Sequence, residues 1–222
     1  KAWDERWKRW HTCSLCEQEY HGVVRCALGW ACWKTYVGRP EKESDWSRRL
    51  AITQLGNGLY HGRHYEDAVS VKEVELAMER RLGAGEGDLL AMQGNLAVTY
   101  QRVGRFEDSL SIWRDTYTRR LKLSGKEHIA TLRAAFNYAN FLNDLQRYAE
   151  SKSVLCKVIP VAKRAPGEGQ ALMLKMKQAY ASALCKDPDA TLDDLREAVT
   201  TLEDVERTAR RVLGGAHPTT GG

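Results

Sequence analysis

A short pattern recurs along this chain of 222 residues at a nearly fixed interval, and this repetition constrains the fold more than any other feature. Residues 94–109 predict a helix, a tight turn and the start of a second helix. Asn95 and Phe106 are matched by Asn137 and Tyr148, each 42 positions later. Because such a period, with one helical hairpin per unit, is typical of stacked helical repeats, the sequence predicts a solenoid.

About four hairpins are expected between residues 48 and 213. They pair residues 48–61 with 65–82, residues 88–103 with 106–123, residues 128–145 with 148–164, and a helix starting near Gln170 with one running from Thr191 to Leu213. Small residues are expected where two helices of a hairpin cross, at Gly56, Ala97, Ala139 and Ala181. Aromatic residues are expected to fill the gaps between neighbouring units, at Tyr65, Phe106 and Tyr148. The segment 186–190 lengthens the fourth hairpin by about five residues.

Composition and charge narrow the class of protein. The chain is 43% hydrophobic and 28% charged, close to an average soluble protein. Its apolar runs are shorter than a membrane helix requires, so no membrane association is expected. The net charge of +5 is spread among residues of both signs, which disfavours a nucleic acid as partner.

The first twelve residues carry Trp3, Trp7 and Trp10 at helical spacing. Two interpretations stay open. These side chains form a capping helix packed on the next segment, or they form an exposed anchor for a partner or a membrane surface.

Four of the six cysteines crowd into the first 32 residues. Cys13, Cys16, His21 and Cys26 have the C-x2-C-x4-H-x4-C spacing of a CCHC zinc knuckle, whose thiolates and imidazole can bind Zn²⁺ tetrahedrally. The alternative is that Cys26, with Cys32, is a core residue of a helix over residues 23–37. This clustering favours metal binding over disulfides and hence a reducing, cytoplasmic location.

Two further cysteines, Cys156 and Cys185, lie in helical patterns and are expected to be buried as small hydrophobic residues. The sequence contains no phosphate-binding loop, nucleophile elbow or H-E-x-x-H motif. His61 and His64 fall on a predicted turn, where exposed polar residues are expected. The protein is therefore not expected to be an enzyme.

The pairs Leu55-Gly56 and Leu96-Ala97, with an aromatic residue and a small residue following in the second helices, resemble the tetratricopeptide repeat. The 42-residue period and the closing stretch 213–220, with His217, Pro218 and Thr220, are similar to the kinesin light chain variety. The resemblance implies an all-α, right-handed α-solenoid of about four tetratricopeptide-like hairpins over residues 45–222, truncated at the C-terminus. A small Cys/His-rich helical cap over residues 1–40 precedes it.

In such arrays the first helices of the hairpins line a concave groove that receives peptides. By register, the resemblance implies a peptide-binding groove made of Thr53, Asn57, Tyr60, Gln101, Arg102, Arg133, Asn140, Asn143, Lys175, Gln178, Ser182 and Lys186. Its basic residues favour acidic segments of a protein partner. The predicted function is a non-enzymatic scaffold for protein–protein interaction. The alternative is a zinc-dependent regulatory or nucleic-acid-binding module carried on a helical-repeat platform.

Overall fold

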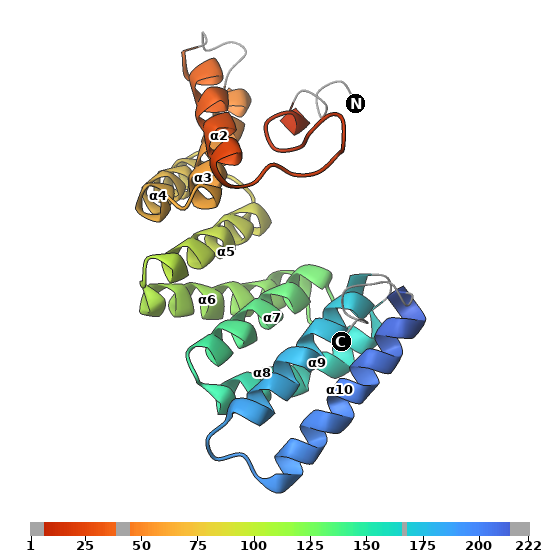
Figure 1. Ribbon diagram of the computed structural model, residues 1–222. Coiled ribbons are helices and arrows are strands. Elements are labelled where there is room, and N and C mark those ends of the chain that lie inside the picture. The colour runs from red at the N-terminus through yellow and green to blue at the C-terminus, as the bar shows by residue number, and fades with distance from the viewer. Residues whose placement is uncertain (1–6, 39–44, 166–167, 214–222) are drawn as a thin grey trace. The chain divides into compact units, whose positions relative to one another are not determined.

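The computed structural model describes residues 7–38, 45–165 and 168–213, and the secondary structure there is helical apart from one isolated β-bridge between Thr12 and Glu19. Where the structure describes the connection, successive helices are joined by short turns (Figure 1). In chain order they are α2 (Gly22–Val37), α3 (Asp45–His61), α4 (Tyr65–Arg81), α5 (Glu86–Arg102), α6 (Phe106–Ser124), α7 (Ile129–Asp144), α8 (Tyr148–Arg164), α9 (Glu168–Lys186) and α10 (Leu192–Leu213). Each predicted hairpin corresponds to two of them, which confirms the all-α repeat fold.

The chain divides into two compact units, residues 1–109 (unit 1) and residues 110–222 (unit 2). In unit 1, α2 packs on α3, α3 on α4 and α4 on α5. In unit 2, α7 packs on α8, α8 on α9 and α9 on α10, and α7 also contacts α9. The division into a cap over residues 1–40 and an array over residues 45–222 stays a prediction. The predicted opening of a further repeat after Leu213 lies outside the described residues.

The helices of a hairpin cross at small buried residues, as the sequence predicts. Ala97 and Ala139 are fully buried. Each carbonyl accepts a hydrogen bond of 2.9 Å from a buried serine twelve residues later, Ser109 Oγ and Ser151 Oγ respectively. These bonds satisfy both serine hydroxyls, so a polar residue is tolerated at a crossing.

The fourth hairpin keeps the same crossing despite its longer connection. Ala181 and Ala198 are both fully buried and pack together with Leu184. They lie 17 positions apart, five more than in the second and third hairpins. The connection is held by Asp187, which accepts a bond of 2.8 Å from Lys152 Nζ on α8. The extra residues are therefore accommodated in the loop, and the helix crossing is unchanged.

The turns between paired helices share one left-handed residue. Arg63, Gly104 and Gln146 have φ values of 65°, 76° and 60°, and they follow each other at 41 and 42 positions. Glycine adopts this conformation freely, whereas a residue with a Cβ is strained there. The repeat geometry thus imposes the same backbone conformation whichever residue occupies the turn.

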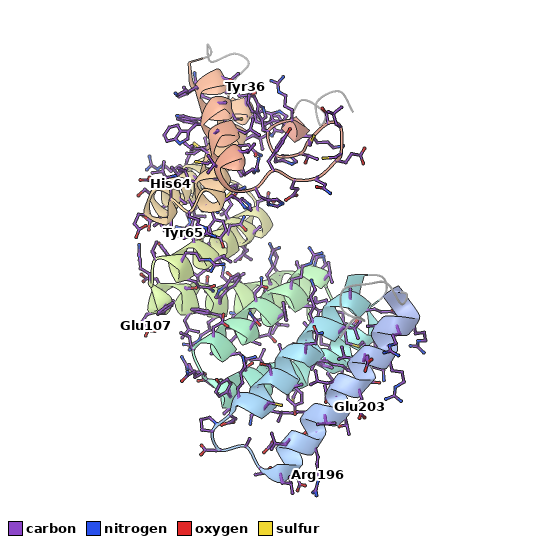
Figure 2. The ribbon with its side chains drawn as sticks, in the orientation of Figure 1. Tyr36, His64, Tyr65, Glu107, Arg196 and Glu203 are labelled. Atoms are coloured by element: carbon purple, nitrogen blue, oxygen red, sulfur yellow. The ribbon has the colours of Figure 1, made fainter. Side chains whose placement is uncertain are left out.

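Within unit 1, the segment before α2 packs against α2 and α3. Trp7 stacks on Tyr36 at 4.9 Å between ring centroids, and Trp10 meets the same ring edge-on at 6.3 Å. Tyr36 is labelled on α2 in Figure 2. Buried Arg25 donates hydrogen bonds to the Trp10 carbonyl and, at 2.8 Å, to Gln54 Oε1 on α3. The capping interpretation is therefore correct for Trp7 and Trp10, while Trp3 lies outside the described residues.

Helices α2 and α3 approach each other closely at two glycines. A Cβ on Gly29 would lie 2.8 Å from the Gln54 carbonyl oxygen, and a Cβ on Gly58 would lie 2.8 Å from the Arg25 carbonyl oxygen. A side chain at either position would push the two helices apart.

Two predictions about burial are wrong. Cys156 and Cys185 are exposed, because each follows a buried leucine and is therefore rotated about 100° from the buried row of its helix. Phe106, the first residue of α6, is 47% exposed and does not fill a gap in the way that was predicted. Within the described ranges, no helix has both the length and the hydropathy needed to cross a membrane.

Candidate functional site

A polar cavity of about 440 Å³ in unit 1, here called the unit-1 groove, is enclosed by one face from each of three helices. Its lining residues are Arg49, Thr53 and Asn57 from α3, Lys72, Glu75 and Glu79 from α4, Ala84 and Gly85 from the following turn, and Asp88, Ala91, Met92 and Asn95 from α5. The spacing of three or four positions within each helix points these side chains toward a common space.

The α4 side of the groove is made of buried charged groups. Lys72, Glu75 and Glu79 are only 7%, 6% and 2% exposed. Each has a partner on α3. Arg49 forms an ion pair with Glu79, Thr53 donates its hydroxyl hydrogen to Glu75, and Lys72 Nζ donates to Asn57 Oδ1 at 3.2 Å.

Burial shifts the acid–base properties of this surface. It lowers the pKa of Lys72 to about 8, against an ordinary value of 10.5, and the nearby Glu75 carboxylate only partly offsets this. Burial also raises the pKa of Glu75, while the hydrogen bond from Thr53 acts in the opposite direction. Burial therefore makes the charged forms of Lys72 and Glu75 less stable than they are in water. A ligand that supplied complementary charge would offset this loss.

The repeat register shows how unusual these charges are. Ala68 of α4 and Ser151 of α8 are equivalent positions of their hairpins and lie 83 residues apart in the sequence. The same shift matches Lys72, Glu75 and Glu79 to three residues of α8. Those residues, Leu155, Val158 and Ala162, are buried and belong to the apolar core of unit 2. Unit 1 thus carries charged side chains at positions that unit 2 uses for its core.

The structure places the five predicted groove residues of unit 1 in different roles. Thr53 and Asn57 line the unit-1 groove, and their role in peptide binding stays a prediction. Tyr60 accepts a hydrogen bond of 3.2 Å from Arg102 Nε, and Lys72 Nζ lies 5.6 Å from the centroid of its ring. Gln101 instead donates to Ser109 Oγ at 3.3 Å, inside the second hairpin.

The remaining predicted groove residues lie on α7 and α9, which pack on each other in unit 2. Asn143 joins the two helices by donating to the Ala179 carbonyl at 2.9 Å. The others are exposed or half-buried: Arg133, Asn140, Lys175 and Lys186 are exposed, and Gln178 and Ser182 are half-buried. This set is called the α7/α9 face below.

Sequence reasoning missed the α4 side of the groove. Its signal was present: Lys72, Glu75 and Glu79 follow Ala68 at i+4, i+7 and i+11, on the face that the buried Ala68 occupies. Charged residues on a predicted buried face of a helix mark a site, because buried charges need partners.

The structure does not gather the four predicted zinc ligands into one site. Cys13 and Cys16 meet on a turn before α2, where the backbone N–H groups of Cys16 and Leu15 donate to the Cys13 sulfur and lower its pKa to about 7. Cys26 is buried within α2, and the ring of His21 lies 5.9 Å from that of His61. Among the described residues, no group of three or more ligands is arranged to hold a metal ion. Zinc binding stays a prediction.

Comparison with known proteins identifies the family of the central part of the chain. Residues 88–173 match the tetratricopeptide repeat family. This match covers α5 to the start of α9, including the second and third hairpins. This central part of the chain therefore consists of tetratricopeptide repeats.

Two of the similar solved structures show which type of repeat fold the chain has. One is described as kinesin light chain nearly identical TPR-like repeats of Podosopora anserina. It has a TM-score of 0.66 and 17% identity, over 84% of this chain and 86% of that one. The other is BtubC (BKLC) from P. vanneervenii, with a TM-score of 0.69 and 12% identity, over 86% of this chain and 74% of that one. No curated protein matches the sequence. At these identities the likeness establishes a kinesin light chain-like repeat fold.

Proposed function

We propose that the protein is a non-enzymatic scaffold that holds an extended peptide segment of a partner protein in the unit-1 groove. The observation that carries the proposal is the set of charged α4 residues at positions where α8 has apolar core residues. Burying Lys72, Glu75 and Glu79 costs stability that an apolar side would not cost. Side chains kept at such a cost are candidates for recognition.

The groove chemistry suits a peptide backbone flanked by polar side chains. The amides of Asn57 and Asn95 can both donate to and accept from a peptide main chain. Met92 and Ala91 add apolar contact area on the α5 side. The lining residues include Arg49 and Lys72 against Glu75, Glu79 and Asp88, so the groove accepts a segment that carries charges of both signs.

The proposal is tested by selecting linear peptides from a random phage-displayed library on the purified protein and measuring their affinity by calorimetry. We expect Glu75→Gln and Asn95→Ala each to weaken the selected peptide about tenfold, the equivalent of one lost polar contact of about 1.4 kcal/mol. The control is Glu66→Gln, a matched change at an exposed position of α4. Equal affinity for all four proteins would refute the groove assignment.

The α7/α9 face is proposed as a second contact surface, for an acidic part of the same partner. Its charged members Arg133, Lys175 and Lys186 are basic and exposed. Charge reversal at Arg133 and Lys175 is expected to abolish capture of a partner with acidic segments and to leave the helical circular dichroism unchanged. Reversal of exposed Lys126 and Lys157 serves as control. Unchanged capture by the first variant would remove this face from the proposal.

Zinc binding by the segment before α2 is retained as a second candidate function. It is favoured by the hydrogen bonds from Leu15 and Cys16 to the Cys13 sulfur, which stabilise a thiolate next to a second thiol. Metal analysis of purified protein should find about one zinc per chain, and Cys13→Ser with Cys16→Ser should remove it. Metal-free protein would exclude this candidate.

A further inference from the structure

A second polar cavity, in unit 2, lies among three helices and is separate from the α7/α9 face. It measures about 500 Å³ and is lined by Lys163 of α8, by Gln170, Met173 and Lys177 of α9, and by Asp204, Arg207, Thr208 and Arg211 of α10. On α9, Lys177 points roughly 160° away from Lys175, because two residues of an α-helix span about 200°. This cavity is called the basic pocket.

The lining of the basic pocket is strongly unbalanced in charge. It contains four cationic side chains, contributed by all three helices, and the single carboxylate of Asp204. Lys177 Nζ forms an ion pair with that carboxylate. Lys163, Arg207 and Arg211 therefore add a charge of about +3 that the lining itself does not neutralise.

The fields of these cations converge within the pocket. The hydrogen bond from Lys177 is the main cause that holds the pKa of Asp204 below its usual range, and the charges of Lys177, Arg207 and Lys163 lower it further. Three cations from three different helices thus act on the Asp204 carboxylate. Gln170 and Thr208 add neutral hydrogen-bonding groups, and the buried Met173 adds an apolar surface.

From this geometry we propose that the basic pocket binds a small soluble anion that carries two or more adjacent phosphate groups. Guanidinium forks and lysine ammonium groups are the usual protein ligands of phosphate oxygens. A single carboxylate would leave most of the excess positive charge uncompensated. A cavity of this volume lies in the range of small-molecule sites.

The surroundings of the pocket decide between a small anion and a long one. The adjoining surface of α10 is lined by Arg207, Arg210 and Arg211 together with Glu203 and Glu206, and Glu206 is paired with Arg210. Glu203 is labelled on α10 in Figure 2. These carboxylates would repel a polymer such as RNA that continued past the pocket. The positive charge is local, which favours a compact ligand.

The test is calorimetric titration of the full chain with sodium tripolyphosphate at low salt. We expect saturable 1:1 binding, weakened at least tenfold by Lys163→Glu with Arg211→Glu and weakened again at high salt, since exposed charges are screened. The control variant, Lys126→Glu with Lys157→Glu, makes the same change of charge at exposed positions outside the pocket and should bind like the unchanged protein.

Three results would overturn the proposal: no heat of binding, equal weakening in both variants, or binding only to vesicles that contain a phosphoinositide. The peptide-selection experiment does not depend on this pocket, so the two proposals can fail separately.

Discussion

Helices α4 and α8 occupy equivalent places in unit 1 and unit 2, yet one buries charges where the other buries apolar side chains. Lys72, Glu75 and Glu79 correspond to three core residues of α8, Leu155, Val158 and Ala162. The crossing residues Ala68 and Ser151 are fully buried in both helices. The comparison shows that the repeat geometry fixes which positions are buried, whereas their chemistry is open to functional use.

The largest effect on stability is expected from replacing a core residue of α8 with the charged residue that α4 has at the equivalent position. Leu155→Lys should lower the free energy of unfolding by about 3–5 kcal/mol, because Leu155 is fully buried in an apolar core and the residue equivalent to Glu75 there is Val158. Urea denaturation followed by circular dichroism measures this. A loss below about 1 kcal/mol would mean that the α8 position is not a core position and would break the comparison.

The reciprocal change replaces charged residues of α4 with apolar ones, and it distinguishes the effect on stability of one substitution from that of two. Glu75→Val alone should destabilise the protein by about 2–4 kcal/mol, because the buried Lys72 ammonium loses its carboxylate neighbour. Lys72→Leu with Glu75→Val gives α4 the residues of α8 and should be neutral or stabilising. If the double variant is as unstable as the single one, these charges are needed for folding.

The pH dependence of stability tests the burial of Lys72. Its folded pKa of about 8 is lower than the ordinary value of 10.5, so between these values the unfolded chain binds more protons. Stability contributed by this group should therefore rise with pH across that window, by about 2–3 kcal/mol in total. The measured quantity is the difference in unfolding free energy between the unchanged protein and the Lys72→Leu, Glu75→Val variant, from about pH 7.5 to 10. A flat difference would show that Lys72 is solvated.

The smallest effect concerns the turn shared by the hairpins of both units. Gln146→Gly and Arg63→Gly should each stabilise the protein by about 1 kcal/mol, because glycine removes the strain of a positive φ. Gly104→Ala should destabilise it by a similar amount. Thermal unfolding of the three variants gives the comparison. A lower melting temperature for Gln146→Gly or Arg63→Gly, or a higher one for Gly104→Ala, would show that the three turns are not equivalent.

The sequence was informative about the repeats because their small residues are dictated by backbone contact. Ala97 and Ala139 must be small whatever the protein binds, so their spacing predicts the hairpins directly. The register also selected Thr53 and Asn57, two of the residues that line the unit-1 groove; their role in peptide binding stays a prediction. It missed Lys72, Glu75 and Glu79 because the resemblance directs attention to the first helix of each hairpin, and these residues lie in a second helix. Cys156 and Cys185 were misplaced because one residue's difference in position rotates a side chain from core to solvent.

The most direct test of the central claim, that α4 keeps its buried charges for recognition, is one variant measured in two ways. Lys72→Leu with Glu75→Val should unfold at the same or a higher urea concentration than the unchanged protein, and should bind the selected peptide at least tenfold more weakly. The matched control is Glu66→Val with Arg80→Leu, on the exposed side of α4, which should keep its affinity. A double variant that binds the peptide with unchanged affinity would contradict the account.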